Sequence, residues 1–133
     1  AKAGIAMWFN QNDKNSDKRT DKRIKGDNKE RFAEDYLLAK GWQLIERNFN
    51  CKAGEIDLIM KDDDYLVFVE VRYRETNEFG GALASITPNK QRKLHRAAEF
   101  YLLKHFNNSP PPCRIDAVGI EGDNRIEWIK NAF

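Results

Sequence analysis

The sequence has little of what marks a membrane, secreted or zinc-dependent protein. Its 133 residues include two cysteines and two histidines, and no Cys-x-x-Cys pair or Cys/His run with zinc-site spacing occurs. No hydrophobic run approaches the roughly 20 residues of a membrane span. The apolar patch at residues 4–9 is too short for a signal-peptide core. We therefore expect a cytoplasmic protein, not bound to a membrane, with both thiols reduced.

Neither sign of charge dominates, because positive and negative residues nearly cancel to a net charge of +2 at pH 7. Residues 1–25 hold seven Lys/Arg against three Asp, whereas residues 26–133 hold sixteen Lys/Arg against eighteen Asp/Glu. A nucleic-acid partner would therefore be held by local basic patches and by the tail. Length and composition predict one domain at residues 26–133, preceded by a basic tail at residues 1–25 that is disordered or loosely helical.

Two apolar segments carry a carboxylate where a hydrophobic side chain would be expected. Residues 54–59 include Asp57, and residues 68–74 include Glu70. The polar residues 61–64 between them are typical of a turn, so the two segments are predicted to form an antiparallel hairpin. Such a hairpin would bring Asp57 and Glu70 close together.

Strand alternation puts Glu70, Arg72 and Arg74 on one face of the second strand. Two carboxylates forced together repel and lose water, so the arrangement needs a positive partner, either a divalent metal ion or a basic side chain. Oxygen ligands favour a hard ion such as Mg²⁺, which takes one or two carboxylates and leaves its other positions to water and phosphates. The alternative is a same-face salt bridge between Glu70 and Arg72, worth about 0–1 kcal/mol.

Apolar periodicity predicts two helices. The first spans residues 27–40, with Glu34 at the border of its apolar face, where the carboxylate either reaches a site on the sheet or stays solvated. The second begins after Thr87 as N-cap and Pro88 as first helical residue, and it runs to about residue 105.

Strands are predicted at residues 42–50, 114–120 and 126–129 in addition to the hairpin, with a loop at residues 77–85. The order is thus helix, three-strand antiparallel meander, helix and two further strands. Positive charge gathers in the first half of the second helix, at Lys90, Arg92, Lys93 and Arg96. This helix start is either a phosphate-facing patch or a solvated surface.

The assembled order resembles the core of the restriction-endonuclease-like nucleases, which carry a D…(E/D)xK signature. More narrowly, residues 26–133 resemble the YraN-like family of small bacterial proteins, regarded as predicted endonucleases akin to archaeal Holliday junction resolvases. The matching positions are Gly26, Glu34, Arg47-Asn48, residues 54–59, residues 68–71, Phe79-Gly80, Thr87, Lys90-Gln91, residues 114–116 and residues 131–133.

The resemblance implies an α/β fold with a central mixed sheet, its antiparallel three-strand meander flanked by helices. It also implies hydrolysis of DNA phosphodiester bonds with Mg²⁺ or Mn²⁺, on branched or recombination intermediates, by a homodimer. Asp57 and Glu70 would bind the metal, and Glu34 would be an additional acidic residue. The nucleic-acid contacts would be Arg74, Lys90, Gln91, Arg92 and Lys93.

Arg72 stands where the family pattern most often has lysine. Lysine can shift its pKa beside an attacking water, whereas arginine stays protonated and acts as a fixed clamp on phosphate. Arg72 is therefore suited to stabilising charge and poorly suited to act as a general base. A non-catalytic nucleic-acid-binding protein on the same fold is the main alternative. A protein-interaction domain and a carboxylate-pair glycosidase are the other classes that the residues leave open.

Overall fold

The computed structural model describes residues 21–76, 80–122 and 124–133. In these residues the elements are two helices, five strands and one 3₁₀ turn. They follow the order α2 (Asp21–Leu38), β1 (Gln43–Cys51), β2 (Gly54–Asp62), β3 (Tyr65–Arg74), η3 (Leu83–Ser85), α3 (Pro88–Phe106), β4 (Cys113–Glu121) and β5 (Arg125–Ile129). The predicted order of helices and strands is confirmed.

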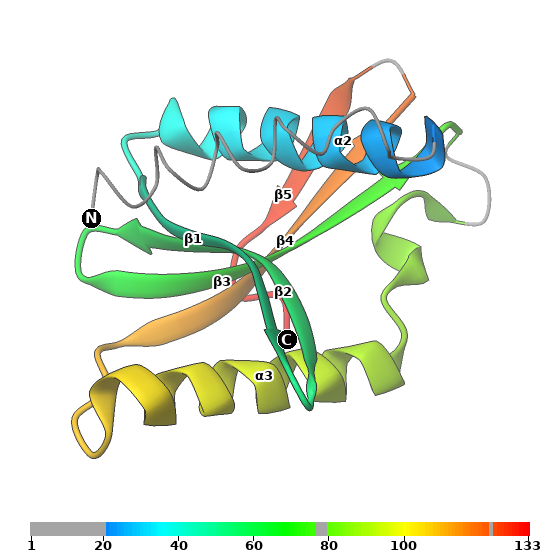
Figure 1. Cartoon of the computed structure of the whole chain (residues 1–133). Coiled ribbons are helices and arrows are strands. Elements are labelled where there is room, and N and C mark those ends of the chain that lie inside the picture. Colours follow the sequence, from blue (N-terminus) through cyan, green and yellow to red (C-terminus); the bar gives the residue numbers. More distant parts are fainter. Residues whose placement is uncertain (1–20, 77–79, 123) are drawn as a thin grey trace.

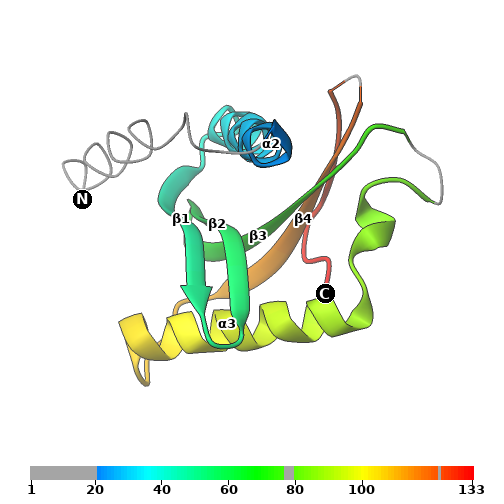
Figure 2. The ribbon, with the colours of Figure 1, turned by 45° about the vertical axis from the view of Figure 1, so that its right-hand side comes forward.

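The strands form one mixed sheet in the order β1-β2-β3-β4-β5. The first three make an antiparallel meander, β3 and β4 run parallel, and β4 and β5 are antiparallel. Parallel neighbours need a crossover connection, which α3 supplies. Figure 1 and Figure 2 show α2 and α3 on opposite faces of the sheet. The molecule is therefore an α/β protein with three layers.

Each helix packs a separate hydrophobic layer against the sheet. Val67 and Val69 of β3 face α2, whereas Phe68 between them faces α3, because successive side chains of a strand point to opposite faces. The α2 layer is completed by Ala33, Leu37, Trp42, Leu58, Met60, Val118 and Ile120. The α3 layer is built around Phe49, Ile56, Ile59, Leu94, Ala97, Tyr101 and Ile115. Covering both faces explains why the central strands are almost continuously apolar.

The helix α2 begins at Asp21, six residues before the predicted start at residue 27, and it ends at Leu38 rather than residue 40. Residues 21–26 are mostly polar and add no apolar repeat, so periodicity could not detect that part of the helix. The helix thus includes residues 21–25 of the predicted tail. Residues 1–20 of that tail, and residues 77–79 of the predicted loop, lie outside the described residues.

The helix α3 begins as the sequence predicted. The Thr87 hydroxyl accepts a hydrogen bond from the Lys90 amide at 3.2 Å, and Pro88 occupies the first turn. The helix ends at Phe106, one residue beyond the prediction, and Asn107 follows with φ at 52°. Neither helix in the described part of the chain is long and apolar enough to cross a membrane.

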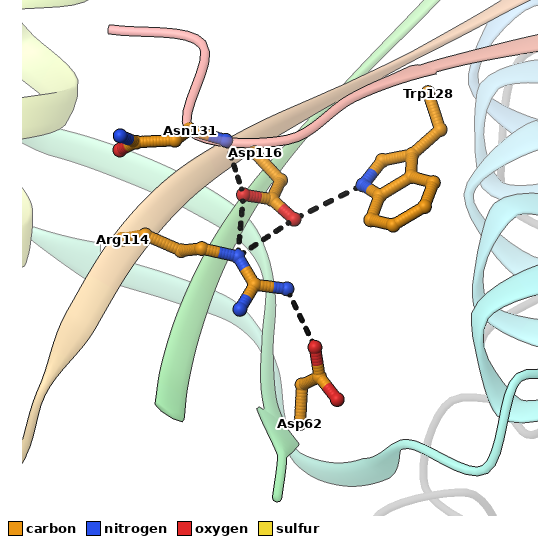
Figure 3. A network of polar contacts seen from close by, with 5 residues as sticks. All are labelled: Asp62, Arg114, Asp116, Trp128 and Asn131. Carbon is orange, nitrogen blue, oxygen red and sulfur yellow. Dashed lines mark hydrogen bonds and ion pairs between the residues drawn. The ribbon is translucent and has the colours of Figure 1, made fainter. Parts of the chain in front are cut away.

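A buried network of charged and polar groups joins β2, β4, β5 and the C-terminal segment (Figure 3). Asp116, with none of its surface exposed, accepts hydrogen bonds from Arg114, from the Trp128 indole at 3.0 Å and from the Asn131 amide at 2.8 Å. Arg114 also donates to Asp62 at 2.8 Å. One guanidinium, two carboxylates and two further N–H donors therefore satisfy each other across these elements.

Candidate functional site

The backbone ladder between β2 and β3 ends one residue short of Asp57 and Glu70. Its last pair is Leu58 with Val69, so one further step of the same register would place Asp57 opposite Glu70. Instead the strands separate, and the Asp57 carboxylate accepts the backbone amide of Val71 at 2.8 Å. The Asp57 carboxylate thus replaces a backbone carbonyl as the acceptor for the Val71 amide, and this hydrogen bond holds the carboxylate between the two strands.

A pocket of about 340 Å³ opens where the strands separate. The sheet contributes Asp57, Glu70 and Arg72, and the first half of α3 contributes Lys90 and Lys93. The remaining lining residues are Glu30, Gly54, Glu55, Val71 and Leu94. The predicted hairpin therefore brings both carboxylates into one cavity, and the cavity is edged by basic residues from the first half of α3.

Asp57 is the most strongly perturbed acid of the site. Its pKa is raised well above the ordinary value of 3.8, first by loss of water and then by the charge of Glu70 and a hydrogen bond with that residue. The charge of Glu30 raises the pKa further, and the hydrogen bond from the Val71 amide opposes these effects. Asp57 therefore either holds a proton or requires a cation beside it.

Arg72 lies beside Glu70, on the same face of β3. An Arg72 terminal nitrogen contacts a Glu70 carboxylate oxygen at 2.5 Å, so the same-face salt bridge left open by the sequence is present. Glu70 is only 7% exposed. The Arg72 Nε is buried without a hydrogen-bond partner among the described residues. One N–H donor of this guanidinium, at the wall of the pocket, therefore has no acceptor among the described residues.

Glu34 and Glu30 lie one turn apart on α2 but have different surroundings. Glu34 is 3% exposed, and the Arg47 guanidinium grips its two carboxylate oxygens at 2.5 and 2.6 Å. Among the described residues that line the pocket, Glu34 is absent and Glu30 is present. The predicted acidic residue of the first helix therefore faces a buried arginine, and its neighbour faces the site.

Asn48 connects Glu30 to β2. Its backbone has φ at 52°, a conformation that asparagine tolerates better than most residues. With the amide group oriented to satisfy its neighbours, the Asn48 nitrogen donates to Glu30 and to Glu55 at 3.0 Å each. Sequence reasoning assigned none of these three residues to the site. The i, i+4 spacing of Glu30 and Glu34 was the available signal.

The predicted nucleic-acid contacts are spread over the pocket rim and beyond. Lys90 and Lys93 line the pocket. Gln91 donates from its side-chain amide to a carbonyl oxygen in the turn before α3, at 3.2 Å. Arg92 and Arg74 are exposed, the first on α3 and the second at the end of β3. The structure therefore groups the two lysines with the carboxylates, ties Gln91 to the backbone before α3 and leaves the two arginines exposed outside the pocket lining.

The donor set fits a divalent metal ion. Asp57 and Glu70 supply carboxylate oxygens, and a cation between them would offset both the loss of water and the repulsion by Glu70 that raise the pKa of Asp57. No three His, Cys, Asp or Glu side chains among the described residues form a closed ligand cluster. Mg²⁺ sites in proteins often have only one or two carboxylate ligands, and water and substrate phosphates fill the remaining coordination positions.

Comparison with known proteins gives a consistent family. The model of the uncharacterised protein family UPF0102 matches residues 29–120, which contain every residue of the pocket lining. A UPF0102 protein of Colwellia psychrerythraea is 47% identical over 131 residues, covering 96% of this chain and 99% of its own. Another, of Nitrosomonas europaea, is 51% identical over 111 residues, covering 82% of this chain and 92% of its own. The chain therefore belongs to the uncharacterised protein family UPF0102, the YraN family that its sequence resembles.

Proposed function

We propose that this protein is an endonuclease that hydrolyses DNA phosphodiester bonds with Mg²⁺ or Mn²⁺, in the pocket between β2, β3 and α3. The observation that carries the proposal is the joining of the half-buried Asp57 and the buried Glu70 with three cationic side chains in one cavity. Carboxylates without a metal repel phosphate, and cations alone do not activate water. A pocket with both carboxylates and cationic side chains can bind a catalytic metal ion and the phosphodiester at the same time.

The side chains divide the work by charge. Asp57 and Glu70 would hold the metal, and a bound divalent ion would supply polarisation of the phosphate and a lowered pKa for an attacking water. Lys90 and Lys93 bind the phosphate oxygens and orient the strand from the side of α3. Arg72 adds a fixed positive charge beside Glu70 for the charge that develops on the phosphate.

The topology supports a restriction-endonuclease-like core for this site. The acidic residues come from adjacent strands of an antiparallel meander, and the third strand of that meander runs parallel to β4. A helix precedes the meander and another follows it. This is the arrangement that the D…(E/D)xK resemblance implies, with Asp57 on β2 and Glu70 on β3.

The test is cleavage of labelled duplex, single-stranded and four-way-junction DNA with Mg²⁺ or Mn²⁺. Asp57→Asn and Glu70→Gln remove one charge each and keep the side-chain shape, so each should lower the rate at least ~100-fold. Asp64→Asn, at an exposed position of the β2–β3 turn, is the matched control and should cut at the wild-type rate. Cleavage that survives in both pocket variants would contradict the proposal.

A non-catalytic nucleic-acid-binding protein is the second candidate, and the state of Arg72 favours it. Arginine cannot lose its proton in a protein, and this guanidinium is already bound to Glu70. Binding without turnover predicts DNA affinity that falls steeply with salt in every variant, with no metal-dependent cutting. The same set of substrates and variants therefore separates the two candidates.

A further inference from the structure

One flank of α3 continues from the pocket along the helix. Lys93, Arg96, Phe100 and Lys104 follow one another at three- and four-residue steps, so they lie within about 80° of the helix circumference. All four residues are exposed. Glu99, the one acidic residue of α3, lies about 100° from Phe100 around the helix axis, beside Arg96. We call these four residues the α3 flank.

The α3 flank lies beside the β1–β2 hairpin, whose tip reaches α3 in Figure 2. Gly54 at that tip lies close enough to Lys93 that an added Cβ would be 3.7 Å from the lysine Cβ. The Phe49 ring packs at 6.4 Å between centroids from Phe100, and at 5.1 Å from Tyr101. One side of the Phe100 ring is therefore supported by the core.

Phe100 nevertheless keeps 47% of its surface exposed. Proteins that bind single-stranded nucleic acid present aromatic rings among lysines and arginines. The bases stack on the rings, and the phosphates contact the cations. In a duplex the bases are paired and stacked on each other, so they offer no free face to such a ring. The Lys93 end of the flank is in the pocket wall, about 10 Å along the helix axis from Phe100.

We propose that the α3 flank binds an unpaired DNA strand that leaves the pocket, with a base stacked on Phe100 and phosphates on Lys93, Arg96 and Lys104. The inference rests on the proposed function for the pocket end, because it makes the preferred substrate one with a single-stranded segment next to the scissile phosphate. Charge complementarity and continuity with the pocket select a nucleic-acid strand as the occupant.

The test measures binding in EDTA, where no metal-dependent cleavage interferes. Fluorescence anisotropy compares a labelled oligothymidylate with a hairpin duplex of the same strand length. Phe100→Ala should weaken binding of the single strand about 5- to 100-fold and leave duplex binding within about twofold, because one stacking contact is lost. Phe100→Trp should restore the affinity, and Phe100→Leu should not, since leucine packs on the core but offers no ring face.

Phe32→Ala is the matched control for Phe100→Ala. Phe32 is 36% exposed on α2, on the opposite face of the sheet, so its removal should leave both affinities unchanged. Arg96→Gln should reduce the slope of log affinity against log salt concentration by about 0.7 for the single strand, the value of one phosphate contact. Circular dichroism of each variant establishes that it is folded.

Unchanged single-strand affinity in Phe100→Ala would overturn the inference, as would an equal loss for duplex and single strand. Conversion of a wild-type dimer to a monomer by Phe100→Ala, in sedimentation velocity, would also overturn it by showing that a second copy covers the ring. The pocket proposal fails separately, through cleavage that survives in both Asp57→Asn and Glu70→Gln. A selective loss of single-strand affinity in Phe100→Ala, together with no metal-dependent cleavage by the wild type, would therefore support this inference and reject the nuclease proposal.

Discussion

Two regions of the sheet hold carboxylates, and they solve the same electrostatic problem in different ways. Asp116 on β4 is fully buried, and three donors from Arg114, Trp128 and Asn131 satisfy its oxygens. Asp57 on β2 is partly exposed in the pocket, where loss of water and then the charge of the nearby Glu70 raise its pKa. The Asp116 carboxylate has the partners that it needs within the chain.

The difference indicates which carboxylate supports the fold and which is available for binding. A buried charge with matched partners contributes specificity to the fold and has nothing left to offer a ligand. A carboxylate held against another one is destabilised by the protein and is relieved by a cation. Arg114 strengthens the contrast, because its guanidinium also lies over the rings of Trp42 and Tyr65 at 5.2 and 5.3 Å.

The largest effect on stability is expected from Asp116→Ala. The change leaves Arg114 and the Trp128 indole buried without their acceptor, which should lower the free energy of unfolding by about 3–5 kcal/mol. Urea denaturation followed by tryptophan fluorescence measures it. Asp64→Ala, at an exposed position, should change it by less than about 0.5 kcal/mol. A loss below about 1 kcal/mol in Asp116→Ala would show that the network is not what supports β4 and β5.

The next largest effect is expected from adding metal. At about 100 times its dissociation constant, Mg²⁺ bound only to the folded protein should raise the free energy of unfolding by about 2.7 kcal/mol. Asp57→Asn should abolish this increase, and Asp116→Asn should keep it, because only the first residue lies in the pocket. Thermal unfolding in EDTA and in excess Mg²⁺ gives the comparison. Equal stabilisation of both variants would place the metal elsewhere.

A smaller increase in the free energy of unfolding is expected for Asp57→Asn without metal. Folding raises the pKa of Asp57, so its stabilising contribution is present below the ordinary value of 3.8 and is lost as pH rises through the raised pKa. Asparagine has no such loss. In EDTA at pH 7 the variant should therefore be more stable than wild type. The stability gap should close as pH falls toward 4, and a less stable variant at pH 7 would contradict the pKa shift.

The smallest effect on stability is expected for Arg72→Lys. Lysine keeps the charge beside Glu70 and removes the buried Nε donor that lacks a partner, so the free energy of unfolding should change by less than about 1 kcal/mol. The cleavage rate should rise, because lysine can approach an attacking water as a compact charge. Single-turnover cleavage of the preferred DNA substrate measures the rate. A fall would indicate that the guanidinium clamp itself is required.

Much of this fold could be predicted because local patterns agree with it. The alternation around Glu70 gave the face of β3, and the Thr87-Pro88 pair gave the start of α3. The start of α2 could not be predicted, since its first turns carry polar residues without an apolar repeat. The partners of Asp116 were also hidden, because Trp128 and Asn131 reach it from another strand and from the C-terminal segment.

The sequence by itself determined that Asp57 and Glu70 meet, because a short polar turn between two apolar strands fixes the register of a hairpin. Only the tertiary structure decided which glutamate of α2 joins them. Glu30 and Glu34 lie one turn apart on the same side of α2, so the sequence does not distinguish them. The choice depends on where the helix crosses the sheet and on the Arg47 guanidinium, which binds the Glu34 carboxylate. Such contacts join elements distant along the chain, so no local pattern encodes them.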